Sequence, residues 1–210
     1  WSRYQLGFIN PIIRENIING SEIILPAESG GEDIAAMILP MDTNMPQEYL
    51  ILENRQQLGS DAYLKESGLL IWHIDETITG MYPALNSVNV NPDFYGVNLI
   101  QADGEGDLYD NCNQCVADAG DPFPGNFGIT GLINPSTYSY DRDADGVIES
   151  GNGSNIEITN IIEDGDGNIT FKVTDPHLIG STIGYDEGGY EGMAFADGSV
   201  IEWAGIRFTS

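Results

Sequence analysis

Positive charge is scarce in this chain of 210 residues. It has 7 Lys and Arg residues against 33 Asp and Glu residues, which gives a formal net charge of −26. A surface this acidic repels phosphate backbones and offers no basic cluster that would release counterions from a nucleic acid. The composition therefore argues against DNA or RNA as a partner.

Histidine is also scarce, since His73 and His177 are the only two. A His-Glu-x-x-His zinc site needs two histidines four residues apart on one helix. These two are 104 residues apart (177 − 73) and neither is followed by Glu. The sequence has no Gly-x-Ser-x-Gly stretch either, so it gives little support to a serine hydrolase. We expect no catalytic residue in this chain.

Long apolar runs are missing. A transmembrane helix needs about 18 to 20 consecutive apolar residues, whereas a stretch such as 68–72 already ends at His73. We therefore expect no membrane span. The chain begins at Trp1 rather than Met, and we expect it to be a processed piece of a longer precursor.

The only two cysteines, Cys112 and Cys115, lie in an acidic loop that lacks the strand and helix of a thioredoxin-like redox motif. Three interpretations stay open: a short local disulfide, two free thiols, or half of a metal site. A zinc site would need two more ligands, and the chain offers only its two histidines for that role.

Apolar residues are present in the amount a folded protein needs, at 41% of the chain, with 10% aromatic residues. Stretches rich in Ile, Leu, Val and Tyr recur between Gly, Pro, Asn and Asp, a pattern that predicts strands. No convincing helical stripe is present, although 60–65 could form a single turn. The strand candidates are 22–26, 35–39, 49–53, 69–75, 97–102, 156–162 and 169–173.

Composition changes twice along the chain. Between Asp103 and Gly153 it shifts to Gly, Asp, Asn and Pro, which predicts a long irregular acidic segment held by something other than an apolar core. After Asp175 a new Gly-rich pattern begins. The fold class predicted is therefore mainly β with long irregular acidic loops, divided into residues 1–177 and the start of another module at 178–210.

Acidic residues at alternate positions of 141–149 predict a calcium loop. Carboxylates at positions 1, 3 and 5, a Gly at position 6, a carbonyl at 7 and an acid at 9 match the EF-hand pattern, but position 12 is Asn152 instead of Glu and the flanks do not look helical. We favour a calcium loop on a β scaffold over a solvated acidic turn. The expected ligands are Asp141, Asp143, Asp145, the Val147 carbonyl and Glu149.

Three other acidic stretches have short spacing. Those at 103–107 and 118–121 make Asp103, Asp107 and Asp121 candidates for a second calcium site, which we weigh evenly against solvated loops. The stretch at 163–168 lies between two strand candidates, where Asp-Gly and Gly-Asn favour an ordinary hairpin turn.

His73 and Asp75 fall on the same face of the strand candidate 69–75. An imidazole and a carboxylate in this arrangement are typical of an acid/base pair, or of a metal ligand with its supporting group. A hydrogen-bonded histidine in the core is the commoner arrangement, and we favour it.

Several stretches together resemble the secreted zinc metallopeptidases of the immune inhibitor A family. The likeness extends over about residues 1–175. Its most specific parts are the Leu-Glu-Asn-Arg-Gln and Leu-Ile-Trp-His-Ile-Asp sequences. The stretches that carry it are 1–11, 48–56, 68–76, 101–104 with 107–108, and 120–125.

This resemblance implies the β-rich C-terminal part of an α+β metallopeptidase domain, without the zinc-binding helix that precedes such a part. It implies secretion, a missing N-terminal catalytic portion as partner, protein or peptide substrates for the parent, calcium in acidic loops, and zinc only in the missing part. Residues 184–188 and 204–209 are similar to the opening of β-sandwich modules on secreted bacterial proteases. A non-catalytic, calcium-dependent binding or adhesion module on the same scaffold is the alternative hypothesis.

Overall fold

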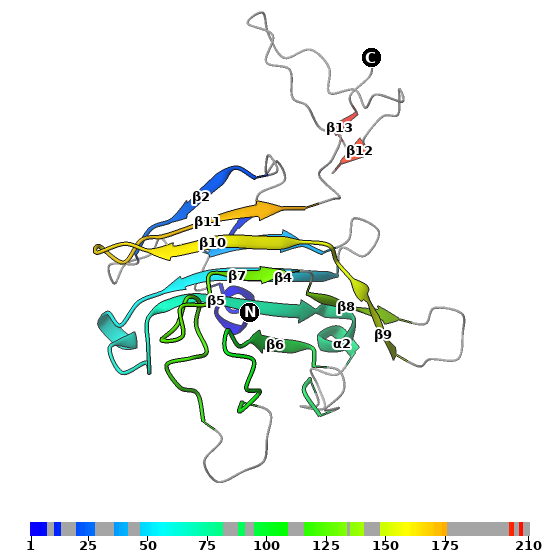
Figure 1. The fold of residues 1–210 in the computed structure, drawn as a ribbon. Coiled ribbons are helices and arrows are strands. Elements are labelled where there is room, and N and C mark those ends of the chain that lie inside the picture. The colour runs from blue at the N-terminus through cyan, green and yellow to red at the C-terminus, as the bar shows by residue number, and fades with distance from the viewer. Residues whose placement is uncertain are drawn as a thin grey trace, which may run out of the picture.

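In the computed structural model the chain is mainly β, as predicted. The structure describes residues 1–7, 11–13, 20–27, 36–41, 47–81, 88–90, 95–108, 116–133, 135–140, 148–175, 202–203 and 206–207. Two sheets form its main body (Figure 1). Within the described residues no helix has the length and apolar character needed to cross a membrane.

Sheet A has five strands in the order β1-β3-β4-β5-β6, antiparallel except for the parallel pair β1 and β3. Sheet B has four antiparallel strands in the order β2-β11-β10-β7. The bounds in sheet A are β1 Ile12–Ile13, β3 Ala36–Pro40, β4 Glu48–Arg55, β5 Gly68–Asp75 and β6 Val97–Ile100. Those in sheet B are β2 Glu22–Leu25, β7 Gly131–Ile133, β10 Glu157–Glu163 and β11 Ile169–Thr174.

Smaller elements complete the described fold. Two hairpins stand apart from the sheets, β8 with β9 and β12 with β13. Their bounds are β8 Ser136–Tyr140, β9 Ile148–Gly153, β12 Glu202–Trp203 and β13 Ile206–Arg207. The helices are α1 Ser2–Gln5, α2 Glu76–Met81 and the 3-10 turn η1 Gly59–Asp61. Of the module predicted over 178–210, only β12 and β13 are described.

One apolar core lies between the two sheets. Side chains alternate along each strand, so Leu50 and Leu52 of β4 lie on the same face as Leu69 and Ile71 of β5. Sheet B contributes a matching row to this core. Each such side chain stabilises the fold by about 1.5–3 kcal/mol when fully buried. The core members from sheet B are Ile23, Leu25, Ile158, Ile161, Ile169, Phe171 and Val173.

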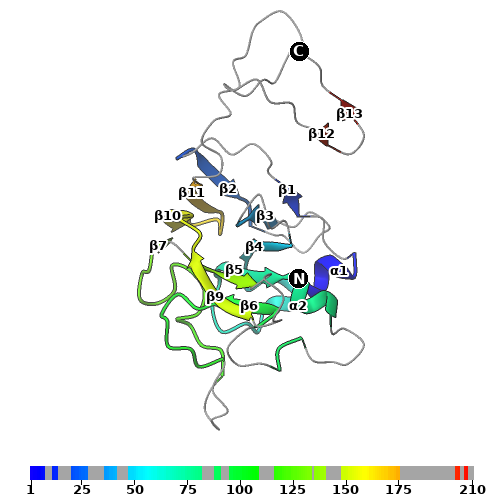
Figure 2. The ribbon, with the colours of Figure 1, turned by 90° about the vertical axis from the view of Figure 1, so that its right-hand side faces the viewer.

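The opposite face of sheet A is apolar as well. Tyr49, Ile51 and Ile74 are buried there, and Tyr4 of α1 packs against them. Figure 2 shows α1 on the side of sheet A that faces away from sheet B. Sheet A therefore buries apolar residues on both faces, and its central strands carry apolar residues in succession.

Asn54 joins the two sheets at one end. It is fully buried, and its Nδ2 atom donates to the carbonyl oxygens of Leu25, Pro26 and Gly167, each at 2.9 Å. Gln56 in turn donates to the Asn54 Oδ1 atom at 2.8 Å. The Asn-Arg-Gln sequence at the end of β4 therefore connects sheet A to β2 and to the β10–β11 turn of sheet B.

All seven predicted strands are confirmed, with shifts at their ends. The irregular segment predicted between Asp103 and Gly153 is wrong in part, because β7, β8 and β9 lie within it. These strands owe their conformation to pairing partners, as in the pairing of Leu132 with Ile158, and not to apolar alternation of their own. The hairpin turn predicted at 163–168 is confirmed between β10 and β11.

Candidate metal centre

The candidate site lies at the end of β6, where residues 121–123 replace β6 as the neighbour of β5. The last pair of β6 with β5 joins Ile100 to Ile71. Beyond it, Leu69 and Phe123 exchange backbone hydrogen bonds of 2.8 and 2.9 Å, and the Ala102 amide donates to the Asp121 carbonyl at 2.9 Å. Residues 121–123 therefore continue the edge of sheet A, which brings 101–108 beside 116–123.

Gly68 makes this exchange possible. A Cβ atom at this position would lie 2.6 Å from the Phe123 carbonyl oxygen and 2.9 Å from the Pro122 Cβ atom, and the backbone has φ of +148°. Contacts this short with backbone cannot be relieved by rotating a side chain. A residue without a side chain is therefore required for 121–123 to reach β5.

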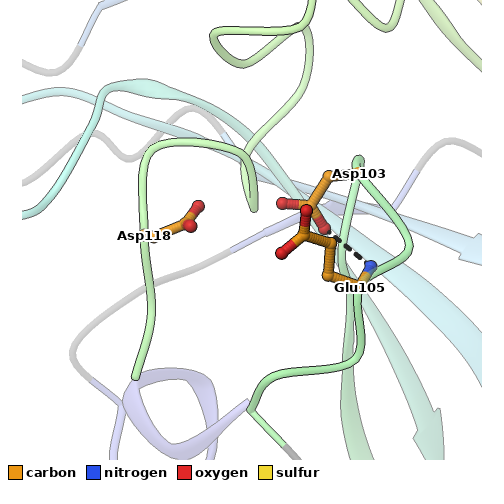
Figure 3. A group of neighbouring side chains, drawn as sticks. All are labelled: Asp103, Glu105 and Asp118. Atoms are coloured by element: carbon orange, nitrogen blue, oxygen red, sulfur yellow. Dashed lines mark hydrogen bonds between the residues drawn. The ribbon is translucent and has the colours of Figure 1, made fainter. Parts of the chain in front are cut away.

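Three carboxylates converge from the two segments. Asp103 and Glu105 follow β6, whereas Asp118 lies on the facing segment and points toward them (Figure 3). Ligand atoms of all three lie within 4.8 Å of one another. The Glu105 amide donates to Asp103 Oδ1 at 3.0 Å, and the Gly120 amide donates to Asp118 Oδ1 at 2.5 Å. These local bonds orient two of the carboxylates, and we call the three residues the acidic triad.

Gly120 leaves room for the triad. A Cβ atom here would overlap Asp103 Oδ2 and lie 3.1 Å from Asp118 Oδ1. The Asp103 carboxylate therefore occupies the space in which any other residue at position 120 would place its side chain. The two segments approach closely because this side chain is missing.

Asp121 is the buried member of the site, with only 4% of its surface exposed. Its Oδ2 atom accepts a hydrogen bond of 2.7 Å from the Asp118 amide, whereas Oδ1 is buried and has no hydrogen-bond partner among the described residues. Burial raises the pKa of this carboxyl above its ordinary value; the Asp118 amide opposes the shift, and the charges of Asp107, Asp103 and Asp118 add to it.

Gln101 shapes the first of the two segments. Its Oε1 atom accepts hydrogen bonds from the amides of Gly106 at 2.7 Å and Asp107 at 3.1 Å, which curls residues 101–107 into a tight loop. The Asp107 Oδ1 atom and the Gln101 Nε2 atom are buried without a partner in the described part of the chain. The loop thus holds further uncompensated polar atoms beside the triad.

The structure revises the ligands expected for a second calcium site. Asp103 belongs to the triad and Asp121 bonds to the backbone of its neighbour Asp118, but Asp107 is not a member of the group. Glu105 and Asp118 complete the triad. Sequence reasoning did not select these two, because only the pairing of 121–123 with β5 places 118 beside 103 and 105.

The predicted calcium loop at 141–149 falls largely outside the described residues. Its flanks are the strands β8 and β9, which pair antiparallel from Tyr140 and Ile148 outward, so the prediction of non-helical flanks is confirmed. The site residues that lie outside the described part, or whose side chains do, are Asp141, Asp143, Asp145, Val147 and Glu149. Cys112, Cys115 and His177 lie outside it too.

His73 is a buried, hydrogen-bonded histidine, as we favoured. Its Nε2 atom lies 2.7 Å from Glu48 Oε1, and the two residues are 3% and 1% exposed. Asp75 has another role, because its Oδ1 atom accepts from the amides of Thr77 at 2.9 Å and Ile78 at 3.4 Å and so caps α2. The hypothesis of a His73–Asp75 pair is not supported by these contacts.

A scan against protein-family models and searches of curated proteins and solved structures gave no match for this chain.

Proposed function

We propose that this chain is the non-catalytic, β-rich portion of a secreted zinc metallopeptidase, and that calcium stabilises it. In this account the parent cleaves peptide bonds with a zinc-activated water and a general base, both supplied by residues outside this chain. The role of the chain is to pack against the catalytic portion and to support the substrate cleft. The sequence resemblance to the immune inhibitor A family suggested this function.

The observation that carries the proposal is the second apolar face of sheet A. Trp1, Tyr4, Trp72 and Val97 are half-buried on this face, over the buried cluster that includes Ile74. We call these four residues the apolar patch. Partly buried aromatic residues gathered on one face are typical of a surface that another part of a protein covers. A catalytic portion that precedes this chain would cover it.

The two metals fit the chain differently. Zinc does not fit the described residues, because their histidine, His73, is engaged with Glu48 and the acidic triad contains oxygen donors only. Calcium fits the triad, since crowded carboxylate oxygens are the donors that it prefers. This division supports a portion that is stabilised by calcium and does not itself perform the chemistry.

A polar hollow favours the alternative function, a calcium-dependent binding or adhesion module. The hollow has a volume of about 280 Å³ and lies between the β4–β5 and β10–β11 hairpins. Ser67 donates to Glu163 across it at 3.1 Å. Its other lining residues are Gln56, Gln57, Leu58, Asp164, Gly165, Asp166 and Gly167.

The test compares this chain with the longer protein that includes the residues encoded before Trp1. We expect the longer protein to contain His-Glu-x-x-His and to cleave an unfolded protein substrate, with activity that zinc chelation abolishes. We expect the isolated chain to cleave nothing in the same assay. A longer protein that lacks the zinc motif and has no peptidase activity would favour the adhesion module.

A further inference from the structure

We infer that Asp103, Glu105 and Asp118 bind a calcium ion, and that the buried carboxylate of Asp121 completes the negative charge of this site. The site extends the proposed function by naming where calcium acts. It does not rest on the peptidase assignment, because the adhesion module would use the same ion. The calcium site and the peptidase assignment can therefore be refuted by separate results.

The first support is the convergence of the triad without a compensating cation. Three carboxylates with ligand atoms within 4.8 Å of one another repel strongly unless a cation lies between them. In the part of the chain that the structure describes, no Lys, Arg or His forms an ion pair with any of them. The fold brings these charges together from two separate segments and does not spread them along one solvated loop.

The second support is independent of the triad and comes from Asp121. Exposed acidic clusters without a bound ion are common in proteins. A carboxylate is uncommon when it is only 4% exposed and its buried Oδ1 atom has no hydrogen-bond partner among the described residues. The other oxygen of this carboxylate is fixed by the amide of Asp118, a triad member, at 2.7 Å. A cation at the triad would compensate the buried charge that the described protein atoms leave uncompensated.

The donor set selects the kind of ion. The three side chains of the triad offer carboxylate oxygen and neither nitrogen nor sulfur, so the site lacks the softer ligands that zinc and copper prefer. Calcium accepts six to eight oxygen ligands in flexible geometry, whereas magnesium requires a nearly ideal octahedron. Carboxylates from two irregular segments suit calcium better.

Calcium binding would tie two stretches of chain together. In the sequence, Asp103 and Glu105 lie before residue 106, whereas Asp118 and Asp121 lie after residue 117. The ion would join these two parts of the chain and hold residues 121–123 against β5, where Phe123 pairs with Leu69. It would add to the anchor that the buried Phe123 side chain already gives this segment in the core between the sheets.

Calorimetric titration with CaCl₂, and separately with MgCl₂, tests the site on the whole chain. The variants are Asp121→Asn and Glu105→Gln, and Glu22→Gln is the matched control because its carboxylate is exposed on β2. We expect the first two to weaken calcium binding by about 10-fold to 100-fold, the loss typical of a damaged metal shell, and the control to bind as the wild type does. Indistinguishable isotherms for all four proteins would overturn the proposal, as would tighter binding of magnesium than of calcium.

A second measurement separates metal binding from a purely structural role. In excess chelator we expect Asp121→Asn to be more resistant to urea than the wild type, because the substitution removes a buried, unpaired charge and Asn can still accept from the Asp118 amide. In saturating calcium we expect the wild type to be more resistant to urea than Asp121→Asn. A variant that is less stable than the wild type under both conditions would contradict the inference.

Discussion

At the scale of single residues, the polar side chains that matter most in this protein are those that lie inside it. Asn54 satisfies three carbonyl groups between the sheets, whereas Asp121 retains a buried oxygen without a partner. The first arrangement stabilises the fold and the second weakens it unless an ion is bound.

The raised pKa of Asp121 predicts a pH dependence in the absence of metal. Its pKa in the folded state lies above the ordinary value of 3.8, so its contribution to stability is fully present below that value and is lost as pH rises through the raised pKa. In chelator, the free energy of unfolding of the wild type should therefore fall, relative to that of Asp121→Asn, as pH increases from about 4 toward neutrality.

Urea titrations at a series of pH values measure this difference. The comparison with Asp121→Asn isolates one carboxyl from the other 32 acidic groups (33 − 1) of the chain. A constant difference between the two proteins across the series would show that Asp121 keeps an ordinary pKa.

Replacing Asn54 should weaken the connection between the sheets. Asn54→Ala leaves the buried carbonyl of Leu25 and the part-buried carbonyl of Gly167 without this donor, which should lower the free energy of unfolding by about 1–3 kcal/mol. Gln57→Ala is the control, because the Gln57 amide donates to Leu64 on the exposed hairpin and its loss should cost less than about 0.5 kcal/mol. Urea denaturation of the two variants checks the difference, and equal losses would contradict it.

At the scale of elements, the sequence predicts the strands and the strand faces that the alternation of side chains determines. Strand β5 was predicted, and so was the face on which Leu69 and Ile71 lie, because alternation alone decides both. The strand β7 and the placement of Asp118 could not be predicted in this way, since each depends on a partner distant in the chain. The helix α2 was also missed, because its six residues are too few to show a helical stripe.

Gly68→Ala should detach the second segment from the edge of β5. The added methyl group would meet the Phe123 carbonyl at 2.6 Å, so residues 121–123 would have to move away and take Asp121 with them. We expect calcium affinity to fall while the sandwich core stays folded. Gly165→Ala is the matched control, because a Cβ atom there meets nothing within 4 Å.

Circular dichroism and calorimetric calcium titration of both glycine variants provide the check. Normal calcium binding by Gly68→Ala would show that the site does not depend on the pairing of Phe123 with Leu69.

At the scale of the whole molecule, two features of the composition now have places in the structure. The net charge of −26 includes carboxylates that the fold gathers at one junction beside sheet A, and the apolar content fills both faces of that sheet. The central claim is that a calcium ion, together with the buried Phe123 side chain, holds residues 101–108 and 116–123 against the sandwich.

Hydrogen exchange with mass spectrometry, in calcium and in excess chelator, tests this claim most directly. We expect chelation to speed the exchange of amides in 101–108 and 116–123, including that of Phe123, and to leave the amides of Leu50 and Leu52 in the core unchanged. Exchange at 101–108 and 116–123 that is the same with and without calcium would contradict the account.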